Sequence, residues 1–234
     1  MSAIFKREFK AYFTSPIGWV FLFAFFIFSG LNFYIGVLLM QSTQVEIVIS
    51  SMLTIVMFLI PIITMRLFSE DKRQKTDQAL LTAPVNLFPM VMGKMLAAFA
   101  IYALAFSVTF IYAVIISFYG RVEWSLYFSN LLGILLLGAA MIPIGGFISS
   151  LTENQVVSAI GSFLIMLILS FVDSLASLTT SEWVQKLIHS VSVYDRYNDF
   201  ALGQLDYSDA VFFLSVAAIF IFLTVRVFEK KRWD

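Results

Sequence analysis

The chain has 234 residues, of which 60% are apolar and only 13% are charged, and its formal net charge is zero. Soluble domains average about 45–50% apolar and about 25% charged residues, so a water-soluble fold is excluded, and the charge gives no indication of a nucleic-acid partner. Because the chain has no Cys and a single His, disulfides, thiolate nucleophiles and His-cluster metal sites are excluded too.

Residues 1–16 predict an amphipathic helix that lies in the plane of a membrane interface. Its apolar and basic side chains recur at helical spacing on opposite faces, the first set being Ile4, Phe5, Phe9, Tyr12 and Phe13, the second Lys6, Arg7 and Lys10. We expect this helix to end before Pro16.

Six apolar segments are long enough to cross a bilayer, since about 20 helical residues span its hydrocarbon core. Hydropathy places them near Ile17–Leu39, Ile47–Arg66, Phe88–Phe118, Leu126–Ser149, Val156–Val172 and Ala210–Phe228. We therefore expect an all-α integral membrane protein with six transmembrane helices in a single domain, residues 1–234.

The distribution of Lys and Arg orients these spans. Only Arg121, Lys186 and Arg196 fall on one side of the predicted membrane, and the other basic residues gather on the opposite side. A basic excess marks the cytoplasmic side. Both termini are therefore expected in the cytoplasm, which agrees with an even number of spans.

Residues 66–87 form a polar cytoplasmic loop whose sequence predicts a short helix. Pro84 stops that helix, and the exposed pair Leu80 and Leu81 requires a surface that buries it. Two interpretations remain open. The helix lies on the lipid headgroups, or it is a coupling helix that inserts into a groove on a cytoplasmic motor protein.

The second cytoplasmic turn, Leu151–Gln155, connects the fourth and fifth spans. Thr152 and Gln155 have the spacing of a capping box that starts the fifth helix, and Glu153 in the first turn is favoured by the helix dipole. This structural role accounts for Thr152, Glu153, Asn154 and Gln155, and a partner contact would be an additional one.

Residues 173–209 form a long external loop that is too apolar for a free linker. Two short helices are predicted, one carrying Trp183, Leu187 and Ile188, the other covering Tyr194–Leu202 and ending at Gly203. They are expected to dip partway into the outer leaflet. Their side chains Trp183, Leu187, Ile188 and Tyr194 then either form an external gate or belong to a lid that seals the bundle.

Signatures of catalysis are missing from the sequence. It contains no GxxxxGK[ST] phosphate loop, no HExxH and no GxSxG motif, and we expect no strong charge within the spans, where ion-coupled transporters usually carry one. We therefore expect no catalytic residue and no metal site, and a membrane-embedded enzyme is strongly disfavoured.

The cytoplasmic loop EDKRQKTDQALLTAP resembles the signature of ABC-2-type permeases, the membrane subunits of ATP-driven exporters. The matching residues, which the resemblance implies as ATPase-coupling residues, are Glu70, Asp71, Lys72, Arg73, Thr76, Leu80, Leu81 and Pro84, and Gly93–Lys94 also fits. Two positions differ from that signature: Lys75 stands where Gly is common, and Gln78 stands where Glu is common. Three further segments, which begin at Glu8, Ser149 and Leu202, resemble the gliding-motility permease (GldF-like) branch.

The resemblance implies one ABC-2-type transmembrane domain over residues 1–234, with an interfacial helix at 1–16, a coupling loop at 66–87 and an external re-entrant loop at 173–209. It places the chain in a bacterial cytoplasmic (inner) membrane. The chain itself would bind no cofactor, because ATP and Mg²⁺ belong to a separate ABC ATPase subunit present in two copies. A second permease copy, or a similar permease, would complete the transporter, and branch members resemble parts of complexes that include a membrane protein with a large extracytoplasmic domain.

Two functions follow. The first is the permease subunit of an ATP-binding-cassette exporter. The alternative is a non-transporting membrane anchor that transmits ATPase-driven motion to an extracytoplasmic partner, since no polar pathway is visible in the spans.

Overall fold

The structure, a computed structural model, describes residues 1–75, 86–176, 183 and 192–233. Over these ranges the ordered elements are helices, and no β-strand occurs among them. In chain order they are α1 (Ser2–Thr14), α2 (Pro16–Phe33), the π-helical segment η1 (Tyr34–Leu39), α3 (Glu46–Thr64), α4 (Ser69–Arg73), α6 (Leu87–Ser117), α7 (Trp124–Leu151), α8 (Gln155–Ala176), α10 (Val193–Ala201) and α11 (Tyr207–Trp233).

Six of the helical stretches are long and apolar enough to cross a membrane: Pro16–Leu39, Glu46–Arg73, Leu87–Ser117, Trp124–Leu151, Gln155–Val172 and Tyr207–Arg232. Each of the six predicted segments falls on one of them, so the prediction of an all-α protein with six spans is confirmed. Their composition makes the chain a multi-pass membrane protein.

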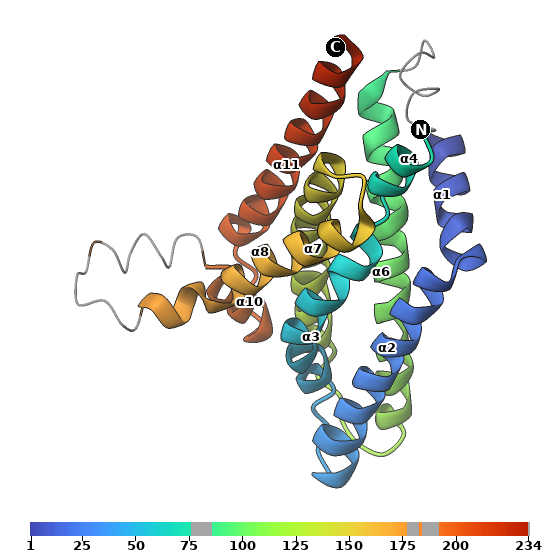
Figure 1. Cartoon of the computed structure of the whole chain (residues 1–234). Coiled ribbons are helices and arrows are strands. Elements are labelled where there is room, and N and C mark those ends of the chain that lie inside the picture. Colours follow the sequence, from blue (N-terminus) through green and yellow to red (C-terminus); the bar gives the residue numbers. More distant parts are fainter. Residues whose placement is uncertain (76–85, 177–182, 184–191, 234) are drawn as a thin grey trace.

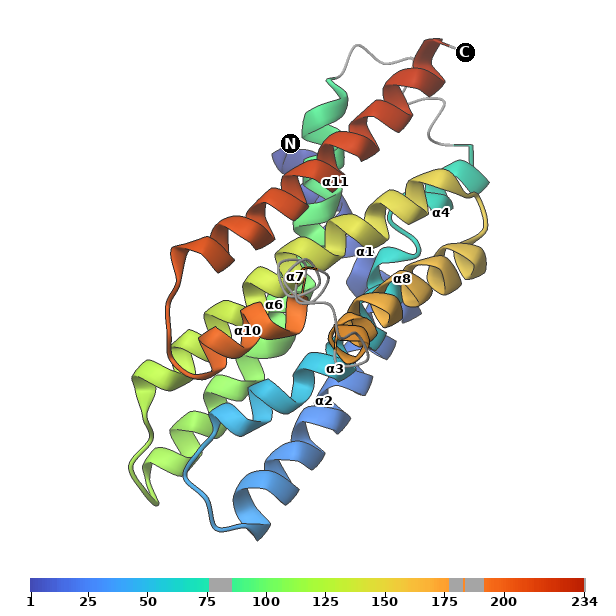
Figure 2. The same ribbon diagram turned by 90° about the vertical axis from the view of Figure 1, so that its left-hand side faces the viewer.

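Both termini lie at the same end of the bundle (Figure 1). We call it the termini end. It also holds α1, α4, the start of α6 and the end of α7, and the loops that follow η1 and α6 lie at the opposite end (Figure 2). The chain enters α2 through Pro16, which occupies the first turn of that helix, where a missing backbone N–H has no consequence.

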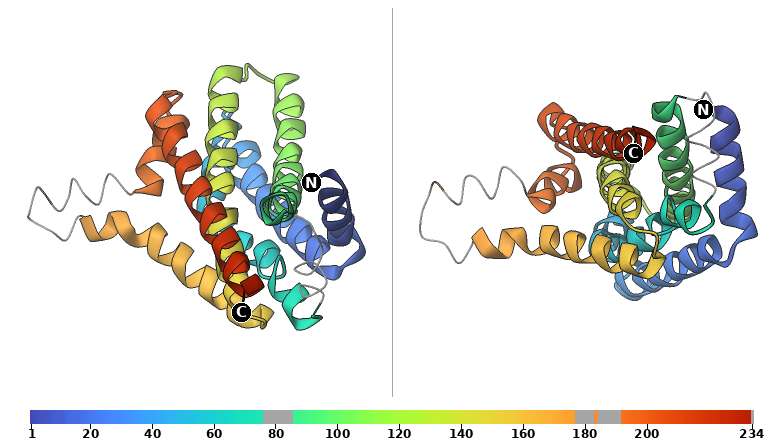
Figure 3. Two further views of the ribbon diagram at one scale, coloured as in Figure 1. Left: turned by 90° about the horizontal axis from the view of Figure 1, so that it is seen from above. Right: turned by 45° about the horizontal axis from the view of Figure 1, so that its top comes forward.

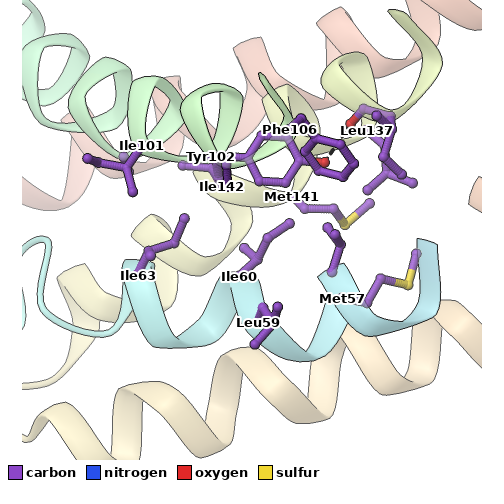
Figure 4. Close-up of a cluster of buried hydrophobic side chains, with 14 of the residues drawn as sticks. Met57, Leu59, Ile60, Ile63, Ile101, Tyr102, Phe106, Leu137, Met141 and Ile142 are labelled. Atoms are coloured by element: carbon purple, nitrogen blue, oxygen red, sulfur yellow. Dashed lines mark hydrogen bonds between the residues drawn. The ribbon is translucent and has the colours of Figure 1, made fainter. Parts of the chain in front are cut away.

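A cluster of buried apolar side chains lies where α3, α6 and α7 meet (Figure 4). Ile60, Tyr102 and Met141 are essentially inaccessible there. The Tyr102 hydroxyl donates a 2.6 Å hydrogen bond to the carbonyl oxygen of Ile134, which satisfies a polar group in an apolar interior. Gly138 makes room for this ring, because a Cβ at that position would lie 2.2 Å from it.

Helix α7 is the centre of the arrangement, since it packs against α3, α6, α8, α10 and α11. Helices α8 and α11 lie beside α7, and α2 lies beside α3 and α6 (Figure 3). All three helices keep apolar outer faces. In a membrane such faces contact lipid, so their exposure is expected. The bundle therefore has a well-buried centre, α3 and α7, and outer helices that are less buried.

Candidate functional site

The ammonium group of Lys94, the eighth residue of α6, is buried at the termini end. The residue is only 1% exposed. Its Nζ lies 2.8 Å from an Asp71 carboxylate oxygen and 3.2 Å from one of Glu8, and it donates a 2.8 Å hydrogen bond to the Leu67 carbonyl oxygen. A buried charge is tolerated when it is paired and hydrogen-bonded in this way. Lys94 thus joins α6 to α1 and α4.

The Glu8 carboxylate is held in its charged form by this arrangement. Its burial alone would raise its pKa, but the Lys94 ammonium and the Arg7 guanidinium, at 2.6 Å, bring the pKa below its ordinary value. The Glu8 carboxylate, which pairs with Lys94, is therefore charged at neutral pH.

A second set of contacts fixes the junction of α1 and α2 to the end of α3. The Tyr12 hydroxyl donates a 2.7 Å hydrogen bond to the Ile63 carbonyl oxygen, and burial raises the pKa of this phenol. The Arg66 guanidinium lies over the Tyr12 ring, donates to the Ser15 hydroxyl and pairs with Glu70 at 3.0 Å. The N-terminal helix is thus attached to the start of the predicted coupling segment.

The end of α7 holds the turn between α3 and α4. The Ser149 hydroxyl accepts hydrogen bonds from the backbone N–H groups of Phe68 and Ser69, both at 3.1 Å, and donates to the Met65 carbonyl oxygen at 3.0 Å. Lys72 donates to the Ser150 carbonyl oxygen. Together with the Lys94 and Arg66 contacts, these bonds form what we call the termini-end network: Glu8, Tyr12, Arg66, Glu70, Asp71, Lys72, Lys94 and Ser149.

The structure brings part of the predicted coupling set into this network. Glu70, Asp71 and Lys72 all face the bundle, whereas Arg73 is exposed. Thr76, Leu80, Leu81 and Pro84 lie outside the described residues. The expectation that the spans hold no strong charge is wrong, because Lys94 lies within the third span and is buried. It is tolerated there because Asp71 and Glu8 supply the opposite charge.

The backbone at Lys75 explains why glycine is common at this position in the sequence pattern. Lys75 has φ = 56°, in the left-handed region that favours glycine. It directly follows Gln74, the C-cap of α4, and glycine is the usual residue at that place. Lys75 therefore carries backbone strain that a glycine would avoid.

The helix that follows the second turn, Leu151–Gln155, has a different N-terminal cap from the predicted one. Helix α8 begins at Gln155, and the Asn154 side chain accepts a 2.9 Å hydrogen bond from the N–H of Val156. The Thr152 hydroxyl instead accepts from the N–H of Asn154 at 3.1 Å. The prediction of a capping box formed by Thr152 and Gln155 is therefore wrong. Asn154 occupies the capping position, and the Thr152 hydroxyl bonds within the turn before it. Glu153 is exposed in that turn.

Helix α10 lies in the predicted external loop, of which residues 173–176, 183 and 192–209 are described. It packs against the first half of α7, where the Ser129 hydroxyl donates to the Phe200 carbonyl oxygen at 2.7 Å, and the Asn130 amide donates to Ala201 at 3.2 Å. The Tyr197 hydroxyl reaches Asn130 Oδ1 at 3.2 Å, and burial raises the pKa of Tyr197 to about 12. The predicted end at Gly203 is confirmed, because this residue has φ = 78°.

The described side chains of the predicted external gate do not take part in the packing of α10 against α7. Tyr194 and Trp183 are exposed, and Leu187 and Ile188 lie outside the described residues. Tyr197 and Phe200 face the bundle instead, which the spacing from Val193 to Tyr197 and Phe200 along one helical face would have indicated. Within the described ranges no group of three or more His, Cys, Asp and Glu residues is placed to hold a metal ion.

Comparison with known proteins gives one family match. The family model described as "ABC-2 family transporter protein" matches residues 2–233. A search of the curated proteins finds no match to this chain.

Proposed function

This chain belongs to the ABC-2 family of transporter proteins, and we propose that it is the permease subunit of an exporter powered by a separate ABC ATPase. ABC-2 permeases generally pair with ABC ATPases. Two ATPase subunits would bind ATP and Mg²⁺, and two permease copies, or this chain and a similar permease, would form the membrane part. Both termini and the network would face the cytoplasm of a bacterial inner membrane, as the distribution of basic residues supports.

The observation that carries this proposal is the termini-end network. Segment 66–87 is the proposed docking site of the ATPase, and its described part is tied to α6 through Asp71 and Lys94 and to α1 through Glu8. When ATP binding moves the docked segment, these ion pairs transmit the motion to two other helices. The Ser149 hydrogen bonds carry the same motion to α7.

At the other side of the membrane, α10 would act as part of a gate. Its hydrogen bonds to α7 through Ser129 and Asn130 couple its position to the helix that Ser149 ties to the network. The gliding-motility branch, and with it a partner with a large extracytoplasmic domain, is supported by the segments that begin at Glu8, Ser149 and Leu202.

Substitution of the leucine pair tests the docking site. We expect Leu80→Asp with Leu81→Asp to prevent co-purification of the ATPase, or to leave a complex whose ATP hydrolysis no longer drives transport. The matched control places the same charge at the opposite end of the bundle, as Phe118→Asp with Tyr119→Asp, two exposed residues. A leucine-pair variant that assembles and keeps wild-type ATPase activity and transport contradicts the role of this segment.

A second function is favoured by the lining of the hollows between the spans. The hollow between α3 and α8 is lined by side chains such as Phe58, Ile62 and Phe163, and nothing polar marks a path for solute there. The chain would then transmit force to an external partner without moving a solute. Reconstitution of the complex in liposomes discriminates, because ATP-dependent movement of solute or lipid without any further partner rules out the purely mechanical function.

A further inference from the structure

A groove runs between α6 and α11 from the termini end into the bundle. It consists of three hollows of about 660, 370 and 220 Å³. Adjacent hollows share lining residues, since Phe88 and Val225 line the first two and Met92, Leu214 and Ala217 line the last two. The hollows are therefore parts of one continuous groove. The helices that form its two sides, α6 and α11, pack against each other.

The groove is polar at its mouth and apolar along its length. The mouth contains Asn86, Glu229 and Arg232, whereas the two deeper hollows are lined by apolar side chains only. Glu229 is paired with Arg226 at 2.6 Å, so the Arg232 guanidinium gives the mouth a positive charge. A ligand that fits has a negatively charged head and an apolar tail.

The length and openness of the groove indicate a membrane lipid. Leu214 and Val225 are eleven residues apart, which is about 16 Å of helix and close to half of a hydrocarbon core about 30 Å thick. Phe88, Leu214 and Phe222 remain more than half exposed, so the groove opens sideways. A lipid in the surrounding leaflet can therefore enter it without passing through the protein.

We infer that this groove binds one anionic phospholipid of the leaflet at the termini end. Its phosphate lies at Arg232 and one acyl chain lies along Leu214, Ala217 and Ala218. Basic pockets between transmembrane helices bind anionic headgroups in this manner. The inference goes beyond the proposed function, because it requires the spans but no ATPase, no particular cargo and no direction of transport.

Lipid retention by the purified full-length chain tests the inference. The protein is transferred from nanodiscs that contain phosphatidylglycerol and phosphatidylcholine with identical acyl chains into mild detergent, and bound lipid is counted by native mass spectrometry. We expect one retained phosphatidylglycerol. Ala218→Phe, which fills the exposed wall of the groove, should abolish retention, and Arg232→Glu should weaken it at least about fivefold, the effect of one basic residue at an anionic surface.

Two controls separate a specific site from general membrane attraction. Ile219→Phe puts the same ring on the adjacent exposed position outside the groove, and Lys230→Glu makes the same charge change two residues from Arg232; both should retain the lipid as wild type does. Equal retention of phosphatidylcholine, or equal effects of Arg232→Glu and Lys230→Glu, overturns the inference. So does an Ala218→Phe protein that keeps its lipid but changes its oligomeric state, because a second copy would then occupy the groove.

Discussion

Replacing Lys94 by Met removes the charge at the centre of the termini-end network and keeps an unbranched side chain of similar size. The carboxylates of Asp71 and Glu8 then lose a partner at 2.8 and 3.2 Å. Removing one partner of a buried ion pair costs about 3–5 kcal/mol. We take the lower end, about 3 kcal/mol, because the Asp71 and Glu8 side chains remain 21% and 13% exposed and water replaces part of what they lose.

In a chain of this length, that loss corresponds to a melting temperature lowered by roughly 6–12 °C, at about 2–4 °C per kcal/mol. Thermal unfolding in detergent, followed by size-exclusion chromatography with fluorescence detection, measures it. Lys230→Met is the control, since Lys230 is exposed and its loss should matter little. Adding Asp71→Asn to Lys94→Met should recover part of the stability, because it removes a carboxylate charge that has lost its contact with the Lys94 ammonium. A Lys94→Met protein as stable as the Lys230→Met control would refute the structural role assigned to Lys94.

Three further predictions concern stability and local order. Folding lowers the pKa of Glu8, so the stability that this carboxylate gives the fold is complete above its ordinary pKa of 4.5 and is lost as the pH falls through the lowered value. Below pH 4.5 the melting temperature of wild type should therefore fall more steeply than that of Glu8→Gln. Parallel curves for the two proteins would contradict this. Lys75→Gly should stabilise the protein by about 1 kcal/mol, because it relieves the left-handed strain, and an unchanged or lower melting temperature would show that Lys75 carries none. Gly133→Ala places a Cβ 2.6 Å from the Cβ of Phe200, an overpacking that costs about 1–3 kcal/mol. Because this weakens the contact of α10 with α7, the backbone amides of α10 should exchange hydrogen faster. Unchanged exchange across residues 193–201 would mean that α10 does not depend on this close contact.

The six spans could be predicted from sequence because hydropathy is a local property. Each span is a continuous apolar run of about bilayer length, and the short breaks at Gln41–Gln44 and Arg121–Glu123 separate neighbouring runs clearly. The end of α1 was also predictable from local sequence, because Pro16 has no backbone N–H and cannot extend the helix that comes before it.

The position of Lys94 could not be predicted this way, because its charge is balanced by residues far away in sequence. The count of basic residues grouped Lys94 with the lysines expected in the cytoplasm, which implied contact with water. The apolar neighbours Met92 and Met95 were the available signal of burial, and Asp71 and Glu8 come close only once α1 and α4 pack against α6. Side-chain partners of this kind are set by tertiary packing.

A side-chain cap at the start of α8 could be predicted from the sequence, but the residue that forms it could not. Thr152 and Asn154 both have side chains that can accept a backbone hydrogen bond near a helix start, and the spacing of Thr152 and Gln155 favoured the wrong one. On α10, Tyr194 was singled out for its aromatic ring, but the helical face set by Val193 decides that Tyr197 and Phe200 meet α7.

The central claim is that a separate ABC ATPase docks on segment 66–87 of this chain. A photo-crosslinking amino acid at Leu80, introduced into the full-length chain in membranes that contain its ATPase partner, tests it most directly when compared with the same probe at Phe118, an exposed residue at the opposite end. We predict a covalent product with the ATPase from position 80 and none from position 118. A product from position 118, or the absence of one from position 80 in a complex that still hydrolyses ATP, would contradict the account.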